Sequence, residues 1–129
     1  MRTRIITNNP KVNIEFSNMI EVDFRPEAEQ MEILTAARNA IHLGGKLIMH
    51  PMMGRIKPHE TPYKSVFMEI PETACEIDME SLLIIEDSLK QTQKYLNNTY
   101  RKKYDESLLP DLQYIDLMLL KVGVEEYRR

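Results

Sequence analysis

Short apolar segments that suit β-strands alternate along this chain with longer segments whose apolar residues recur at helical spacing. Arg4–Thr7 (RIIT) is followed by Met19–Arg25 (MIEVDFR), in which apolar and charged residues alternate. This alternation, with a period of about two, is typical of a strand with one buried face and places it near a sheet edge. Two further strands are expected at Lys46–His50 and Tyr63–Ile70.

Three helices are expected between and after these strands. The first begins at Pro26, because proline suits the first helical position, and ends before the glycine pair at 44–45, where a left-handed conformation is accepted. The second covers Asp78–Asn97, with the aspartate as its N-cap, and the third follows Ser107. The segment 11–18 fits either a short helix or a loop.

This order of elements predicts a single α/β domain over residues 1–129, with a mostly parallel or mixed four-stranded sheet flanked by helices and two long C-terminal helices. The Leu47-Ile48-Met49 run predicts a central strand that is buried on both faces. Ligands of such sheets bind beyond the carboxyl ends of the strands. If the first and central strands are parallel neighbours, Asn8 and Asn9 meet His50 and the loop after it.

Composition narrows the class of protein. The formal net charge of the 129-residue chain is -3, which argues against a general nucleic-acid-binding surface, because such a surface needs a basic footprint. No run approaches the roughly 18 apolar residues that a membrane span needs. The single cysteine, Cys75, cannot form an internal disulfide, which favours a cytoplasmic protein. No sequence pattern indicates a cofactor.

The window 42–64 (HLGGKLIMHPMMGRIKPHETPYK) holds all three histidines of the chain and a local excess of positive charge. Its lysines and arginine are opposed by one acid, Glu60, whereas the rest of the chain is acidic. Loops held on a rigid scaffold commonly carry binding or catalytic residues. We therefore expect the functional site in this window.

The first interpretation of the window is an anion site. Arg55 and Lys57 supply positive charge, and arginine can hold a carboxylate or phosphate through two parallel bonds. The further donors in this interpretation are Thr61, the amides of Asn8 and Asn9, and backbone amides near Gly54. The alternative is a solvated basic loop whose prolines only shape the connection.

Two other kinds of chemistry would use the histidines. His42, His50, His59 and Glu60 form a ligand set that suits zinc or iron, but their spacing matches no short metal motif and no metal site is predicted. For proton transfer, the imidazole of His50 or His59 would act near neutral pH, with Glu60 orienting it or serving as the base. Tyr63 is expected to form a wall of the pocket.

The two C-terminal helices carry apolar residues beyond a single stripe, at Leu83, Ile84, Leu109, Met118 and Leu120. An apolar face of this width indicates a helix that is contacted on two sides. A homodimer or a docking face on these helices is therefore one expectation. The alternative is that both flanks are buried within one domain.

The N-terminal IITNNP and the central HLGGKLIMHPMMGRIKPHETPYKS resemble the GrdX family, whose genes accompany the glycine, sarcosine and betaine reductase systems of anaerobic amino-acid-fermenting bacteria. The resemblance implies an accessory or regulatory protein of these systems. Our leading expectation is that it binds a small anion, or a protein partner such as a reductase component, through the 50–63 loop and the Asn8-Asn9 turn. The alternative is a small enzyme acting on a carboxylate or phosphorylated compound, with His50 or Glu60 in proton transfer. No catalytic residue is implied.

Together, the sequence pattern and the resemblance define a set of predicted binding residues at the end of the first strand and in the central loop. Within the loop, the resemblance favours Lys57 and Glu60 over Arg55 and His59. The predicted set is Asn8, Asn9, His50, Gly54, Lys57, Glu60, Thr61 and Tyr63.

Overall fold

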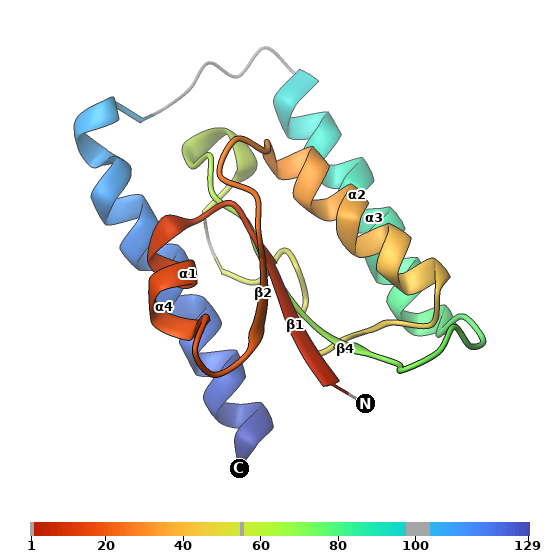
Figure 1. Cartoon of the computed structure of the whole chain (residues 1–129). Coiled ribbons are helices and arrows are strands. Elements are labelled where there is room, and N and C mark those ends of the chain that lie inside the picture. The colour runs from red at the N-terminus through yellow and green to blue at the C-terminus, as the bar shows by residue number, and fades with distance from the viewer. Residues whose placement is uncertain (1, 55, 98–103) are drawn as a thin grey trace.

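The computed structural model describes residues 2–54, 56–97 and 104–129. A four-stranded mixed sheet lies between two pairs of helices (Figure 1). The spatial order of its strands is β2-β1-β4-β3. The strands are β1 (Arg2–Thr7), β2 (Glu21–Phe24), β3 (Lys46–Leu47) and β4 (Ser65–Ile70). The predicted fold class, a single α/β domain with a mixed sheet and two long C-terminal helices, is confirmed.

The central strand β1 pairs with one strand of each direction. It runs parallel to β2, with Ile5 opposite Val22, and antiparallel to β4, with Ile5 opposite Phe67. Because β3 is also antiparallel to β4, the strands β1, β2 and β3 all point the same way. The carboxyl ends of β1 and β2 therefore lie at the same edge of the sheet as Ser65, the first residue of β4, and β3 runs toward that edge.

Two helices cover each face of the sheet (Figure 1). These are α2 (Gln30–His42) and α3 (Met79–Asn97) on one face, and α1 (Pro10–Phe16) and α4 (Leu109–Arg128) on the other. A hydrophobic core lies on each face of the sheet, and successive residues of β1 point into different cores. Ile6 packs with α2 and α3, whereas Ile5 packs with α1 and α4. Across the described residues, every helix is too short or too polar to cross a membrane.

Local capping explains where α1 and α3 begin. The Asp78 carboxylate accepts hydrogen bonds from the backbone N–H of Ser81 at 3.2 Å and from its hydroxyl at 2.7 Å, as the predicted N-cap requires. At α1, Asn9 Oδ1 accepts from the Lys11 N–H at 3.0 Å. The segment 11–18, which the sequence left open, is therefore largely helical.

The first long helix starts later than predicted. It begins at Gln30 and not at Pro26, because the chain between them forms a turn. Asn8 Nδ2 holds this turn by donating to the Ala28 carbonyl at 2.9 Å. The helix is then capped locally, since the Glu29 N–H donates to the Glu32 carboxylate at 3.0 Å.

The prediction of a central strand over Lys46–His50 is wrong. The strand β3 contains only Lys46–Leu47 and lies at the sheet edge, because β4 inserts between it and β1. Ile48 makes one further backbone bond, to the Phe67 carbonyl at 2.9 Å. Met49 then packs against Gly123 of α4, so this apolar run is covered partly by a helix and not by a second strand.

Replacing Ile85 with alanine should lower the free energy of unfolding by about 2–5 kcal/mol, because this side chain of α3 is fully buried in the core beneath α2. Leu83→Ala is the control: its side chain is 66% exposed on the same helix, and the expected change is below about 0.5 kcal/mol. Urea unfolding followed by circular dichroism measures both. Equal losses would contradict the packing described for α3.

Candidate functional site

The polar residues Thr7, Asn8 and Asn9, here called the asparagine corner, end β1 in a buried environment. Asn8 Nδ2 donates to the carbonyls of Ala28 and Pro62, both at 2.9 Å. Asn8 Oδ1 accepts from the Lys64 N–H at 2.9 Å. Asn8 therefore ties the end of β1 to the turn before α2 and to the segment that enters β4.

The fully buried Asn9 ties the same corner to α4. Its Nδ2 donates to the Gln113 carbonyl at 2.8 Å and to Asp116 Oδ2 at 2.9 Å. The side-chain amide of Gln113 links α4 further to the segment before β4, since its Nε2 donates to the Tyr63 hydroxyl at 2.7 Å. The corner thus fixes the position of α4 relative to the segment that precedes β4.

A chain of hydroxyl groups crosses the sheet edge at the corner. The Asn9 N–H donates to Thr7 Oγ1 at 2.9 Å, and Thr7 Oγ1 lies 2.7 Å from Ser65 Oγ. Because the Ser65 hydroxyl donates to Asp116 Oδ2 at 2.7 Å, the Thr7 hydroxyl is the donor in its bond to Ser65. The chain links β1, β4 and α4 and ends on a carboxylate.

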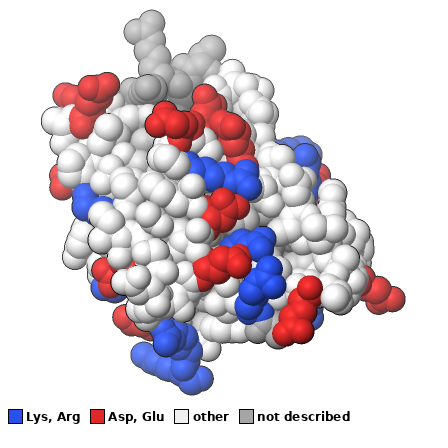
Figure 2. Space-filling model, viewed as in Figure 1, with Lys and Arg blue, Asp and Glu red and all other residues white. Residues whose placement is uncertain are grey.

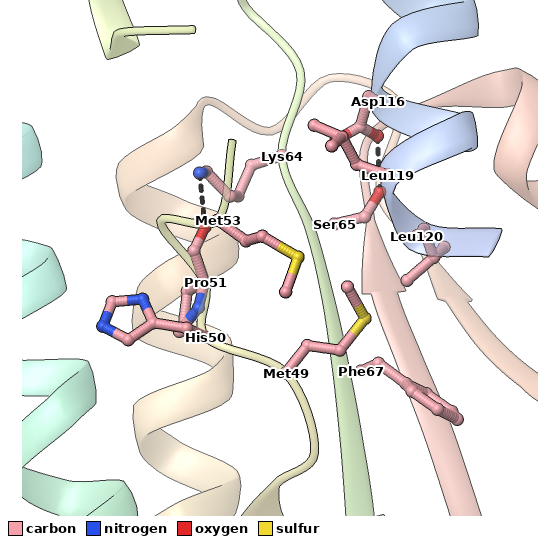
Figure 3. A pocket seen from close by; sticks show the side chains of 10 residues that line it. All are labelled: Met49, His50, Pro51, Met53, Lys64, Ser65, Phe67, Asp116, Leu119 and Leu120. Atoms are coloured by element: carbon pink, nitrogen blue, oxygen red, sulfur yellow. Dashed lines mark hydrogen bonds between the residues drawn. The ribbon is translucent and has the colours of Figure 1, made fainter. Parts of the chain in front are cut away.

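A small cavity of about 40 Å³ lies beside Asp116 (Figure 3). On its far side, Lys64 Nζ donates to the Pro51 carbonyl at 2.7 Å. Burial lowers the pKa of Lys64, an effect opposed by the charge of Asp116. Burial raises the pKa of Asp116, against the hydrogen bonds from Asn9 and Ser65 and the charge of Lys64. The volume slightly exceeds the roughly 30 Å³ that one water molecule occupies in the liquid, and it is too small for a substrate.

A larger pocket of about 450 Å³ opens beside Asn8, and we call it the carboxyl-edge pocket. It is formed by the start of α2, the segment 58–63 and the end of α3. Its volume lies within the range of sites that bind ligands or partner side chains. It is lined by Asn8, Pro26, Ala28, Glu29, Gln30, Pro58, His59, Thr61, Pro62, Tyr63, Leu96 and Tyr104.

The polar groups of this pocket are largely engaged within the protein. Gln30 Nε2 donates to the carbonyls of Pro58 at 2.8 Å and Thr61 at 2.6 Å, and the Asn8 amide is held as described above. Neither lysine nor arginine occurs among the described residues that line it, and the exposed Glu29 contributes an acid. The pocket therefore offers mainly proline, leucine and tyrosine surface.

The predicted binding residues fall into separate groups. Asn8, Thr61 and Tyr63 line the carboxyl-edge pocket, and Asn9 lies in the network that supports it. His50 lines the small cavity instead, and its Nδ1 accepts from the Met52 N–H at 3.0 Å. The asparagine corner and the central loop thus do meet, but through the start of β4 and not through adjacent parallel strands.

The remaining predicted residues shape the loop. The Lys57 N–H donates to the Glu60 carboxylate at 2.8 Å, and Lys57 Nζ lies 5.7 Å from the centroid of the Tyr95 ring. Gly54 has a positive φ of 101°, and a Cβ there would lie 2.8 Å from Leu119 Cδ1. A side chain at Gly54 would therefore meet both backbone strain and crowding. Arg55 lies outside the described residues.

Sequence reasoning missed several polar residues of the site, notably Gln30, Ser65 and Asp116. Two of them carried a signal. Gln30 precedes the apolar stripe of α2, and Asp116 adjoins the buried Leu117 on the apolar side of α4. A polar side chain on the inward side of a helix calls for hydrogen-bonding partners, but the sequence does not say which residues supply them.

The structure also shows how charged side chains and potential metal ligands are distributed. The face shown in Figure 2 carries acidic and basic side chains in alternation down its middle. Among the described residues, Glu21 pairs with Arg2 and Arg4, and Asp23 pairs with Arg25. Within the described parts of the chain, the structure brings no three His, Cys, Asp or Glu side chains close enough to hold a metal ion.

The fold and the site define a small α/β protein with a partly apolar pocket at the carboxyl edge of its sheet. Comparison with known families matches residues 4–125 to the family described as GrdX-like protein. Because this match spans nearly the whole chain, the chain belongs to the GrdX-like protein family. Neither a curated protein nor a solved structure matches it.

Asp116→Asn should remove a pH-dependent cost of folding. Because burial raises the pKa of Asp116, the folded protein keeps a proton that the unfolded chain loses near the ordinary value of 3.8. Between the pKa of Asp116 in the unfolded chain and its higher pKa in the folded protein, the free energy of unfolding of the natural protein therefore falls as pH rises. Asparagine does not titrate, so the variant becomes more stable relative to the natural protein over the same range. Urea unfolding between about pH 4 and pH 7 should show this growing difference.

The exposed Asp111 on the same helix provides the matched control, Asp111→Asn, for loss of a carboxylate from α4. A stability difference between natural protein and Asp116→Asn that stays constant with pH would contradict the assignment of a raised pKa. So would a pH-dependent difference of the same size in Asp111→Asn.

Proposed function

We propose that this protein is an accessory or regulatory protein associated with the glycine/sarcosine/betaine reductase system, and that it acts by binding a protein partner through the carboxyl-edge pocket. Membership of the GrdX-like protein family supports the association. The pocket beside Asn8 and the segment 58–63 supports the mode of action. The protein would localise to the cytoplasm with the reductase.

The single observation that carries the binding mode is the chemistry of the pocket wall. A small anion needs donors or positive charge, yet the amides of Asn8 and Gln30 already bind backbone carbonyls. Lys57 lies over Tyr95, and Lys64 turns toward Pro51. Proline, leucine and tyrosine surface instead suits the apolar side chains of a partner segment, with Glu29 at the rim for a basic neighbour.

The enzyme alternative finds less support in the geometry. His50 is exposed and lines the small cavity, while Glu60 is not among the residues that line either cavity and accepts a hydrogen bond from the Lys57 N–H at 2.8 Å. The two candidate proton carriers therefore do not face a shared substrate site. His59 does line the carboxyl-edge pocket, where its ring stacks on Tyr95 with the centroids 5.8 Å apart.

Leu96→Glu should weaken binding to the reductase component by about tenfold or more, because it places a charge in the apolar wall of the pocket. Leu43→Glu is the matched control. Leu43 is exposed and follows the C-terminal end of α2, whereas the pocket lies at the N-terminal end of this helix. Calorimetric titration with each purified component of the reductase measures both. Equal affinities for the two variants, or no binding by the natural protein, would contradict the proposal.

Phosphate, acetyl phosphate and glycine should leave the melting temperature of the natural protein unchanged, because the pocket wall lacks basic side chains among its described residues. A specific ligand stabilises a protein by mass action, so a thermal scan over a concentration series detects binding. If one of these compounds raises the melting temperature with increasing concentration, and Lys57→Ala abolishes this rise, the result would support an anion site and contradict the partner site.

A further inference from the structure

A further pocket, of about 220 Å³, lies at the edge of the sheet where β1 begins. Its walls come from the first residues of β1, the last turn of α2, the end of β4 and the segment that follows β4. None of its residues lines the carboxyl-edge pocket, which lies beyond the opposite end of β1. We call it the arginine pocket, and we define it by Arg2, Arg4, Ala40, Ile70, Glu72 and Ala74.

The register of the sheet sets the two arginines side by side. Because side chains alternate along a strand, Arg2 and Arg4 share the face of β1 that α2 and α3 cover. Arg2 lies opposite Ile70 of β4, whereas Arg4 lies opposite Glu21 of β2. The guanidinium groups therefore stand between a carboxylate on one neighbouring strand and the apolar end of the other.

Glu21 holds both guanidinium groups and leaves donors on each of them. Arg2 Nε donates to Glu21 Oε1 at 3.2 Å, and Arg4 Nε donates to Glu21 Oε2. A guanidinium has five N–H groups, so each arginine retains the four on its Nη atoms. Among the described residues, no further acceptor binds either side chain. The arginines are thus held in place with hydrogen-bonding capacity to spare.

Glu72 brings the opposite charge to the same pocket. It is exposed and follows the end of β4, two residues after Ile70. Within the described chain, both arginines form their ion pairs with Glu21, and neither pairs with Glu72. The pocket therefore presents positive and negative groups that are not in contact. Since the two carboxylates match the two guanidinium groups in number, the site favours a ligand that carries both charges and no net charge.

The rest of the pocket wall is apolar. Ile70 is only 8% exposed and belongs to the core beneath α2 and α3, and Ala40 packs against the same core. Ala40 and Ala74 have small side chains, which leave space that larger residues would fill. The volume of about 220 Å³ is below the roughly 300–1,000 Å³ of sites for drug-sized molecules, so the ligand is small.

We infer that the arginine pocket binds an α-amino acid with an aliphatic side chain. The carboxylate of the ligand accepts hydrogen bonds from the Nη groups of Arg2 and Arg4, and its ammonium group lies beside Glu72. Its side chain covers Ile70, so glycine gains none of this apolar contact. A carboxylate without an amine is repelled by Glu72, and an amine without a carboxylate is repelled by the arginines.

The test compares leucine with three analogues that each lack one of its groups. Isocaproate lacks the ammonium group, isoamylamine lacks the carboxylate, and glycine lacks the side chain. Calorimetric titration of the full chain should show binding of leucine and at least tenfold weaker binding of every analogue. Absence of leucine binding, or an analogue that binds as tightly as leucine, would overturn the inference.

Glu72→Gln tests recognition of the ammonium group. It should weaken leucine binding about fivefold and strengthen isocaproate binding, so that the two compounds bind about equally. Glu76→Gln is the matched control, because Glu76 is an exposed acid of the same segment that does not line the pocket. It should leave both affinities within about twofold of the natural protein. Equal weakening of leucine binding by both variants would reveal a general effect of charge and overturn the inference.

Arg4→Gln tests recognition of the carboxylate and should weaken leucine binding by about tenfold or more. Arg25→Gln is its control, since Arg25 pairs with Asp23 as Arg4 pairs with Glu21, yet does not line the pocket. The control should bind leucine within about twofold of the natural protein, and equal losses in the two variants would contradict the site. Circular dichroism verifies folding, and the exposed Glu72 keeps the test decisive if Arg4→Gln does not fold.

Discussion

The amides of Asn8 and Asn9 are buried at the end of β1, and each must find its hydrogen-bond partners inside the protein. A buried polar group without a partner costs about 1–3 kcal/mol. Asn8 meets this requirement through the turn before α2 and the segment before β4, and Asn9 meets it through α4. Both helical layers and the central loop are therefore held in position from one corner of the sheet.

The same requirement also engages polar groups of the carboxyl-edge pocket. Side-chain amides that satisfy backbone carbonyls of the protein are not available to a ligand, and this holds for Gln30 as well as for Asn8. The pocket wall that results is shaped by proline and tyrosine on a well-supported backbone. Such a surface favours a partner that contributes apolar area over a small charged molecule.

The location of the site could be predicted from the sequence in part. The asparagine corner and the central loop come together, as the residues after the first strand indicated, and Thr61 and Tyr63 line the resulting pocket. Lys57, Glu60 and Gly54 instead stabilise the loop itself. A basic or glycine-containing loop has the same composition in either role, so composition alone does not separate binding residues from supporting ones.

Local features of the fold were determined by the sequence itself. The edge strand β2 and the Asp78 cap depend on residues within a few positions of one another. Strand order and the burial of Asp116 were decided only by the tertiary structure. The alternating pattern of β4 fits either strand direction, and Asp116 meets Ser65 across 51 positions of the chain. Such distant pairings depend on how all the layers pack, which no local pattern records.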